Sequence, residues 1–557
     1  MNISFVPVTA SAVAAYDCYE IVIQVDEPAF RNPFTEVEII GQFGRDEDLF
    51  TFQHGTPDGE LGTAENRDSL IPVDGFCDSE DGSLYRIRFM PRSAGRYVYT
   101  VSFQYGGKAW SHEGHFDAIA GDNRGLIRVD EEHPFHFVWE GTGEHYFYNG
   151  MTAYHLPGIR KEEEIRRTLD RFHHHKVNRV RIGLSSSRVR NAMAWFEPVY
   201  ESEDFTFCYG PWKAERPDDA ENPGWDVTRF DLAYWHKLER TVEYARQKDI
   251  VLSIIMYVDA YRKGADPFGK FLMGGQDEQR YFRYAASRLA AFPNITWDLT
   301  NEYRLIRPHQ WVERMGHYLQ SCDPYHHLMT CHGHGTFEFR MSGWADFAVY
   351  QSWDESGGYS YMRHNRELQL QTGRIIPQIN EEFGYEDHYP TAWGEGKVYP
   401  MRSRDTLRRR AWEIYMAGCY QTSGEYAGHG LGGWVNGRGD DSMRLLEGFA
   451  HIAAFFETCA WWKANPSEAL VKQPDAFCLA DEGDLYIVYT PVPQNIELQL
   501  QAGSYETTWY NPRTGEFMEP HVVQASGQAV QFECPKVGSS ASATNDDYVL
   551  RLRRSEA

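Results

Sequence analysis

Two carboxylic acids near predicted strand ends are the residues of this sequence best suited to do chemistry. Asn301 and Glu302 follow Ile295-Thr-Trp-Asp-Leu299, whose alternating pattern is typical of a short strand. Glu382 ends a second strand-like stretch, 80 residues further along the chain. A carboxyl group that holds a proton can donate it, and an ionised one can act as a base or a nucleophile. A lone Asn-Glu pair is usually a polar turn, so this interpretation requires that both acids belong to one fold.

The region from about residue 145 to residue 460 alternates between strand-like and helix-like patterns. Residues 250–258 are almost continuously apolar, as in a parallel strand that is buried on both faces. Leu232, Trp235 and Leu238 fall on one face of the helix predicted before it. Eight strands are predicted in this way: 146–154, 177–183, 250–258, 294–303, 327–331, 345–351, 374–382 and 420–424.

Eight strands that alternate with helices predict a (β/α)8 barrel. Glu302 then follows the fourth strand and Glu382 ends the seventh. In this fold the active site lies at the carboxyl ends of the strands, so the two acids would meet at one mouth.

The two ends of the chain show strand patterns without a helical period. Tyr85-Arg-Ile-Arg-Phe89 alternates apolar and basic residues, and Leu485, Ile487 and Tyr489 share one strand face. The expected fold is therefore multidomain: a (β/α)8 TIM barrel over residues 120–463, flanked by β-sandwich domains over 1–119 and 464–557.

Length and charge limit the classes of partner. At 557 residues the chain exceeds what one hydrophobic core usually covers. A net charge of −25 argues against nucleic acid and anionic membrane surfaces as partners. The short basic run Arg408–Arg410 precedes more helical sequence, and we interpret it as a solvated helix face. The sequence leaves a homo-oligomer open.

The cysteines and the N-terminus predict a cytoplasmic location. The nine cysteines are scattered and lack metal-type spacing, as reduced thiols do. The N-terminus has no basic segment followed by an apolar one, so we expect no signal peptide. No apolar run approaches the roughly 18 residues that span a membrane.

Glycoside hydrolysis is the reaction that such a pair of acids fits. One carboxyl group must protonate the leaving oxygen while the other stays ionised. A separation of roughly 5–5.5 Å would give retention of configuration, and roughly 6.5–9.5 Å would give inversion. Because neighbours on a strand point to opposite faces, only one of Glu381 and Glu382 is expected to face the site. Phe383-Gly384 directly after Glu382 favours Glu382.

Several stretches resemble known families. Trp297-Asp-Leu-Thr-Asn-Glu302 and Glu382-Phe-Gly384 are similar to the fourth- and seventh-strand motifs of the clan A retaining glycoside hydrolases. Asn149-Gly-Met-Thr-Ala-Tyr154, residues 376–386 and residues 417–424 resemble the apiosidase-like barrel family.

The flanking regions extend the resemblance to nearly the whole chain. The region before the barrel resembles the immunoglobulin-like domain that often precedes such barrels. Phe477-Cys-Leu-Ala-Asp-Glu-Gly483 and Trp509-Tyr-Asn-Pro-Arg-Thr-Gly515 resemble the collagen-binding domain family that often follows them.

The resemblance implies roles for four residues. Glu302 would be the general acid/base and Glu382 the nucleophile, Asn301 would bind the 2-hydroxyl of the sugar, and Arg181 would hold the nucleophile ionised. Phe383 stands where the family often has proline, and Gly424-Glu425 replaces a more usual glycine followed by His or Asn. These departures leave the identity of the sugar open.

Other polar and aromatic residues at predicted strand ends are candidates for substrate binding. His332 and His334 share a strand face, which could hold a metal or a sugar. No third ligand lies nearby in the sequence, so we expect neither metal nor cofactor. The full set of further candidates is His155, Tyr257, Asp259, His332, His334, Tyr350, Trp353 and Trp434.

The leading hypothesis is a retaining glycosidase that cleaves β-linked plant or microbial oligosaccharides. A non-catalytic carbohydrate-binding protein on a barrel scaffold is one alternative. A His-ligated metallohydrolase is the other.

Overall fold

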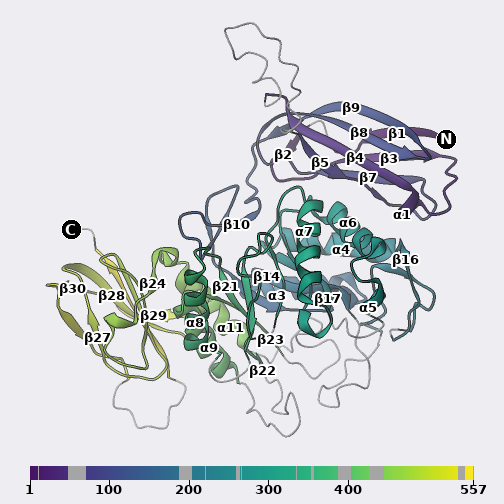
Figure 1. Cartoon of the computed structure of the whole chain (residues 1–557). Helices are drawn as coiled ribbons and strands as arrows, with labels where there is room; N and C mark the ends of the chain where they lie inside the picture. The colour runs from purple at the N-terminus through teal and green to yellow at the C-terminus, as the bar shows by residue number, and fades with distance from the viewer. Residues whose placement is uncertain are drawn as a thin grey trace, which may run out of the picture.

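The chain consists of a central barrel with one sheet-rich region at each end. The computed structural model describes residues 1–9, 12–47, 70–186, 203–219, 221–258, 264, 266–333, 335–352, 357–386, 403–425, 444–536 and 546–555. In Figure 1 the N-terminal sheets lie above the barrel and the C-terminal sheets lie to its left. The predicted order of β-sandwich, barrel and β-sandwich is therefore confirmed.

Eight parallel strands form the barrel. They are β13 (Asn149–Thr152), β14 (Arg179–Ser186), β17 (Val251–Val258), β18 (Ile295–Asp298), β19 (Met329–Thr330), β20 (Ala348–Gln351), β21 (Gln378–Glu382) and β23 (Tyr420–Glu425). Their hydrogen-bonded order is β19-β18-β17-β14-β13-β23-β21-β20. The N–H of Asp346 donates to the carbonyl oxygen of Met329 at 2.8 Å and links the two end strands, so the barrel is nearly closed.

Helices surround the strands as expected, with one exception. They are α3 (Glu162–His174), α4 (Leu232–Arg246), α5 (Gly269–Leu272), α6 (Gln276–Leu289), α7 (His309–Cys322), α8 (Tyr359–Gln371), α9 (Arg404–Met416) and α11 (Leu445–Phe456). Every residue of β17 is buried, which confirms the prediction from its apolar run. The described residues between β19 and β20 contain no helix, so the alternation is interrupted there.

Smaller elements lie around the barrel. A three-stranded sheet, β10 (Ile127–Val129), β11 (Phe137–Trp139) and β12 (His145–Tyr146), precedes it. A hairpin of β15 (Trp212–Ala214) and β16 (Trp225–Phe230) follows β14, and β22 (Tyr385–Glu386) pairs with β23. Short 3-10 turns are η2 (Leu156–Gly158), η3 (Tyr303–Leu305), η4 (Trp461–Lys463) and η5 (Glu468–Leu470).

The N-terminal region contains two sheets. One has the order β1-β3-β7-β6, from β1 (Asn2–Pro7), β3 (Tyr19–Asp26), β7 (Leu84–Phe89) and β6 (Phe76–Cys77). The other has the order β2-β9-β8-β4-β5, from β2 (Ala12–Ala14), β9 (Lys108–Ile119), β8 (Gly95–Tyr105), β4 (Val37–Arg45) and β5 (Ile71–Asp74). A short helix, α1 (Pro33–Glu36), precedes β4.

A buried ionic cluster fixes this region to the barrel. Arg288 of α6 binds Glu239 of α4 at 2.6 Å and Asp78 of the N-terminal region at 2.9 Å. Arg88 of β7 also binds Glu239, at 2.9 Å. The Arg288 side chain is fully buried, so its charge depends on these two carboxylates.

Replacing Arg288 by Ala should destabilise the protein by about 3–5 kcal/mol, because two buried carboxylates each lose one of their cationic partners. The measurement is the first thermal or urea unfolding transition. Arg240→Ala is the matched control, since the Arg240 side chain is 53% exposed and pairs with Glu162 at the surface. That control should cost about 1 kcal/mol or less. An equal loss of unfolding free energy in the two variants would show that the buried cluster stabilises the protein no more than a surface ion pair does.

The C-terminal region carries most of its strands in one sheet. Its elements are β24 (Asn465–Pro466), β25 (Phe477–Asp481), β26 (Leu485–Thr490), β27 (Ile496–Gln499), β28 (Gly503–Asn511), β29 (Glu516–Phe517), β30 (His521–Ala525), β31 (Ala529–Phe532) and β32 (Tyr548–Arg554). β27 and β31 form a separate pair.

The contact of this region with the barrel corrects one interpretation of the sequence. Arg408 of α9 is 4% exposed and binds Asp547 at 2.8 Å. The hydroxyl of Tyr489 donates to the same carboxylate at 3.1 Å, and its ring stacks on Trp412 of α9. The Arg408–Arg410 run is therefore not wholly a solvated face, because the C-terminal sheet packs on Arg408.

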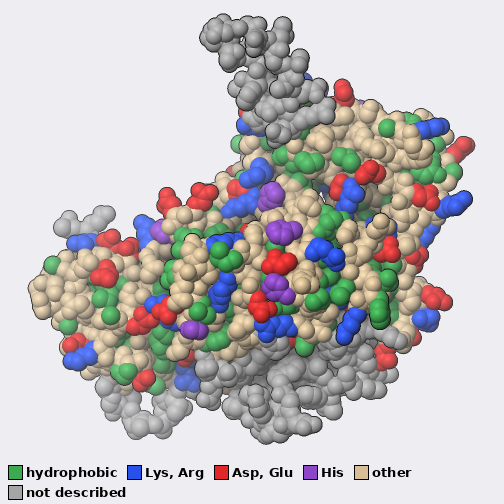
Figure 2. All heavy atoms as spheres, in the orientation of Figure 1, with side chains coloured by type: hydrophobic (Ala, Val, Ile, Leu, Met, Phe, Trp, Pro, Cys, Tyr) green, Lys and Arg blue, Asp and Glu red, His purple; other side chains and the backbone are tan. Residues whose placement is uncertain are grey.

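The surface shows mixed charge. On the face in Figure 2, acidic and basic side chains are interspersed and the basic ones form no continuous area. All nine cysteines lie in the described ranges, and none of them is in a disulfide. Within those ranges no helix combines the length and apolarity that crossing a membrane requires.

Candidate active site

Glu302 lies in a tight turn after β18. The strand ends at Asp298, earlier than the sequence pattern suggested. The backbone of Glu302 is left-handed (φ 46°, ψ 53°), a conformation that is uncommon outside glycine. Two hydrogen bonds hold the turn: Asn301 N–H donates to the carbonyl of Tyr257 and Tyr303 N–H donates to that of His332, both at 3.0 Å. Glu302 is thus fixed at the carboxyl end of the fourth barrel strand.

Glu382 is the last residue of β21 and is 5% exposed. The Tyr154 hydroxyl, just beyond β13, donates to Glu382 Oε1 at 2.5 Å. Arg181 Nη1, on β14, lies 3.5 Å from the same oxygen. Both donors favour the ionised carboxylate, so the first, second and seventh strands together prepare Glu382 to carry a negative charge.

Glu381 also points into the barrel, which the sequence did not predict. The pairing of β20 with β21 shifts register between Tyr350 and Gln351, so that Glu381 is the extra residue of a β-bulge. Its carboxylate lies 2.8 Å from Arg179 Nη1 and 3.4 Å from Arg181 Nε. The expectation that the adjacent acids point to opposite faces is therefore wrong, since Glu381 and Glu382 both contact Arg181.

Arg181 is the centre of this arrangement. Its side chain is fully buried, and it contacts Asp298 at 3.5 Å and the side-chain oxygen of Asn301 at 3.1 Å, in addition to the two glutamates. Burial lowers the pKa of Arg181, but its interactions with Tyr154, Glu381 and Asp298 more than offset this, so that its pKa lies well above its usual value. Arg181 cannot reach solvent, so it acts on the site through Glu382 and Asn301.

The amide of Asn301 is oriented by its neighbours. His332 Nδ1 lies 2.6 Å from Asn301 Oδ1, and Arg181 Nη2 donates to the same oxygen. Since Oδ1 faces Arg181 and His332, the NH2 group points the other way. Among the described residues, no acceptor binds that NH2 group, which leaves it available for a ligand hydroxyl. His332 is itself fully buried and acts through Asn301.

Glu302 affects the ionisation of Glu382. Burial, and then the charge of Glu302, raise the pKa of Glu382 to about 7, while Arg181 and hydrogen bonds from Tyr154 and Tyr385 oppose the rise. Because neighbouring carboxylates repel each other, the ionisation of Glu382 depends on the charge at Glu302.

The remaining predicted site residues divide into three groups. His155 is buried beside the ring of Phe207 at 4.8 Å, close in sequence to Tyr154. Tyr257 and Tyr350 are fully buried, and their hydroxyls donate to Glu278 at 2.8 Å and Gln378 at 2.6 Å. Both hydroxyls are thus used within the fold, and the assignment of the two tyrosines to substrate binding stays a prediction. The others lie outside the described residues: Asp259, His334, Trp353 and Trp434.

Four residues around Glu382 and Arg181 were not among the predicted site residues: Tyr154, Glu381, Asp298 and Tyr385. Arg179 and Arg181, which share one face of β14, could have indicated the two acids Glu381 and Asp298. Two arginines on the inward face of a barrel strand require buried acids nearby. Nothing in the sequence identified those acids, because they come from β18 and from a bulge in β21.

The fold and the site together define a glycoside hydrolase type of barrel. Two carboxylic acids lie at the carboxyl ends of the fourth and seventh strands, beside an oriented asparagine amide. The model of the apiosidase-like catalytic domain matches residues 134–462, so the chain belongs to the apiosidase-like family. A second model, the putative collagen-binding domain of a collagenase, matches residues 469–553. Both resemblances predicted from the sequence are confirmed.

Solved structures show the same fold. A putative glycoside hydrolase from Bacteroides vulgatus is 19% identical, with a TM-score of 0.70, and the match covers 98% of this chain and 100% of that one. A family 5 glycoside hydrolase from the same organism is 16% identical, with a TM-score of 0.58, over 78% of this chain and 93% of that one. Comparison with curated proteins gives no match.

Proposed function

We propose that the protein is a retaining glycosidase that cleaves a β-linked oligosaccharide of plant or microbial origin by double displacement. Glu302 protonates the leaving oxygen and later activates water, and Glu382 attacks the anomeric carbon. Asn301 binds the sugar hydroxyl next to that carbon. The catalytic barrel is assigned to residues 120–463, and the location to the cytoplasm on the evidence of the nine thiols.

The observation that carries the proposal is the set of contacts to Glu382. The Tyr154 hydroxyl at 2.5 Å and Arg181 at 3.5 Å favour its ionised form. Glu302 is half-buried in a turn at the end of a different strand, where its charge raises the pKa of Glu382. The contacts from Tyr154 and Arg181 suit Glu382 to the role of nucleophile, and the place of Glu302 at the end of another strand suits it to the role of acid/base.

A panel of p-nitrophenyl α- and β-glycosides tests the proposal. Turnover of at least one β-glycoside by the wild-type chain, lost in Glu382→Gln, is the expected result. Oligosaccharide binding without turnover of any member would instead indicate a non-catalytic barrel. Activity that disappears with a chelator and returns with a metal ion would indicate a metallohydrolase.

Arg181→Lys should move the acid limb of the pH profile of kcat/KM upward by about one unit, because a cation that opposes the raised pKa of Glu382 is displaced. The value of kcat/KM near neutral pH should fall by roughly 100-fold. Since kcat/KM reports the free enzyme, the shift measures the nucleophile directly.

Arg179→Lys is the matched control for this variant. Arg179 is equally buried, but it binds Glu381 and Ser253. It should lower the melting temperature without moving the acid limb. A shift of equal size in both variants would contradict the role given to Arg181.

A further inference from the structure

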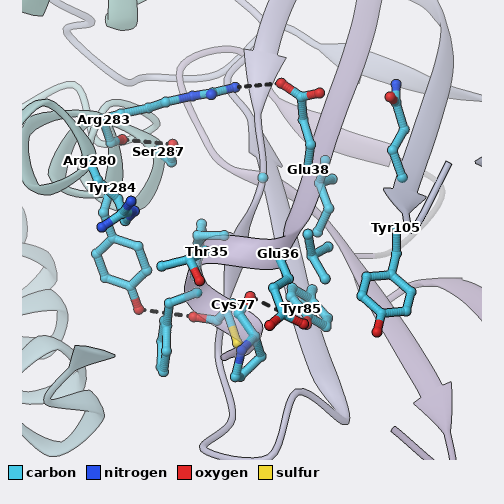
Figure 3. A pocket seen from close by; sticks show the side chains of 18 of the residues that line it. Thr35, Glu36, Glu38, Cys77, Tyr85, Tyr105, Arg280, Arg283, Tyr284 and Ser287 are labelled. Atoms are coloured by element: carbon cyan, nitrogen blue, oxygen red, sulfur yellow. Dashed lines mark hydrogen bonds and ion pairs between the residues drawn. The ribbon is translucent and has the colours of Figure 1, made fainter. Parts of the chain in front are cut away.

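A second cleft lies on the flank of the barrel, between the N-terminal sheets and α6. It has a volume of about 640 Å³ and is lined from α1, β4, the β8–β9 hairpin, α6 and Tyr318 of α7. Figure 3 shows α6 on one side and the strands of the N-terminal region on the other. A volume of this size is within the range of small-ligand sites and can hold more than one sugar ring.

The two walls of the cleft are held in fixed positions. Arg283 of α6 binds Asp74 through two contacts of 2.6 Å and lies 3.6 Å from Glu38 of β4. The Tyr284 hydroxyl donates to the carbonyl of Cys77 at 2.9 Å, as the dashed line in Figure 3 shows. These bonds join the barrel to the N-terminal sheets along the cleft. It is therefore a preformed site, which saves the cost of ordering the walls on binding.

Several polar groups that line the cleft are not used in the fold. Tyr105, at the end of β8, is half-buried, and its ring is held nearly perpendicular to Phe30 at 4.6 Å. In the described part of the chain no partner binds the Tyr105 hydroxyl, the Lys108 ammonium or the Gln276 amide, and all three residues line the cleft. Glu38 is exposed and has one weak contact to Arg283. An aromatic ring, a carboxylate, an ammonium group and an amide thus line one cleft.

The charge of the lining indicates a neutral ligand. Arg283 is paired with Asp74, and Arg280 is paired with Asp277 at 2.5 Å. The positive charge of Lys108 is then outnumbered by the negative charges of Glu36 and Glu38, so the lining does not favour an anionic ligand. An apolar ligand would make no use of the exposed amide, carboxylate and ammonium groups of the lining, whereas hydroxyl groups can bind all three. A hydroxyl-rich ring with one C–H face matches both the polar groups and the ring of Tyr105.

We propose that this cleft is a second, non-catalytic site that binds a neutral oligosaccharide. The ring of Tyr105 packs against a sugar face, and Glu38, Lys108 and Gln276 bind its hydroxyls. The site is separate from the barrel mouth and does not depend on the reaction proposed there. It would hold a glycan chain against the flank of the barrel.

Titration calorimetry on the full chain tests this inference, with cellotetraose, xylotetraose and mannotetraose as probes. The chain carries Glu382→Gln so that no probe is consumed. At least one probe should bind, with a Kd of roughly 0.1–1 mM. Tyr105→Ala should weaken that binding at least about 10-fold, or remove one of two sites, and Glu38→Gln should weaken it several-fold.

Tyr244→Ala is the matched control, since Tyr244 is a half-buried tyrosine on α4 that does not line the cleft. It should leave binding unchanged. Tyr105→Phe keeps the aromatic ring and should retain most of the affinity, which would show that the loss in Tyr105→Ala does not come from misfolding. The inference is overturned if no probe binds at 10 mM, if Tyr105→Ala binds as the parent does, or if only an acidic oligogalacturonide binds. Loss of hydrolysis at the barrel mouth would not affect any of these results.

Discussion

Glu382→Gln is expected to reduce kcat/KM by roughly 10⁴- to 10⁶-fold, because the amide cannot form the bond to the anomeric carbon. The neighbouring Glu381 cannot substitute, since its carboxylate is fully buried and bound to Arg179 and Arg181. The measurement is kcat/KM on the best aryl glycoside of the panel. Loss of less than 10-fold would contradict the role of Glu382.

The stability of the same variant separates lost chemistry from lost fold. The pKa of Glu382 is raised from 4.5 to about 7 in the folded chain, so folding binds a proton there. Stability from this group is full below pH 4.5 and is lost as the pH rises through 7. A glutamine does not titrate and can still accept from Tyr154. The melting temperature of Glu382→Gln should therefore exceed that of the wild type by more at pH 8 than at pH 5.

Glu302→Gln is expected to show an effect that depends on the leaving group. Without a proton donor, hydrolysis of a poor leaving group such as an alkyl alcohol or a sugar should slow by roughly 10²- to 10⁴-fold. A 2,4-dinitrophenyl glycoside needs no protonation, so its first step should slow by less than about 10-fold. The acid limb of the pH profile should also move down, because the charge of Glu302 raises the pKa of Glu382.

Glu338→Gln is the control for this second variant. Glu338 pairs with Arg304, two residues from Glu302 in sequence, and its side chain is 37% exposed. This variant should leave the rates of hydrolysis of both substrates and the pH profile unchanged. An equal loss on the poor and the activated leaving group in Glu302→Gln would rule out acid catalysis by Glu302.

The barrel and the positions of its two acids were predictable because they depend on local patterns. The apolar run of β17 and the alternation around Trp297 identify strands by composition alone. Counting strands then placed Glu302 after the fourth and Glu382 on the seventh. The contacts of Tyr154 and Arg181 with Glu382 were not predictable, since each comes from a different strand and depends on how the barrel closes.

Two errors show where local patterns fail. Glu381 and Glu382 were expected on opposite faces, but the bulge between β20 and β21 turns both toward Arg181. Arg408 was expected on a solvated helix face, yet it is buried by the C-terminal sheet. A β-bulge and the packing of a second domain both depend on residues far away in the sequence. A strand period of 2 or a helix period of 3.6 describes only neighbouring residues, so it cannot predict either feature.

A covalent bond between Glu382 and the sugar distinguishes double displacement from inversion. Incubation of the wild-type chain with a 2-deoxy-2-fluoro β-glycoside of the preferred sugar, followed by peptide mass mapping, detects such a bond. We expect one added fluoroglycosyl group, on Glu382. A label on Glu381 or Glu302, or turnover with inversion and no label, would rule out Glu382 as the nucleophile.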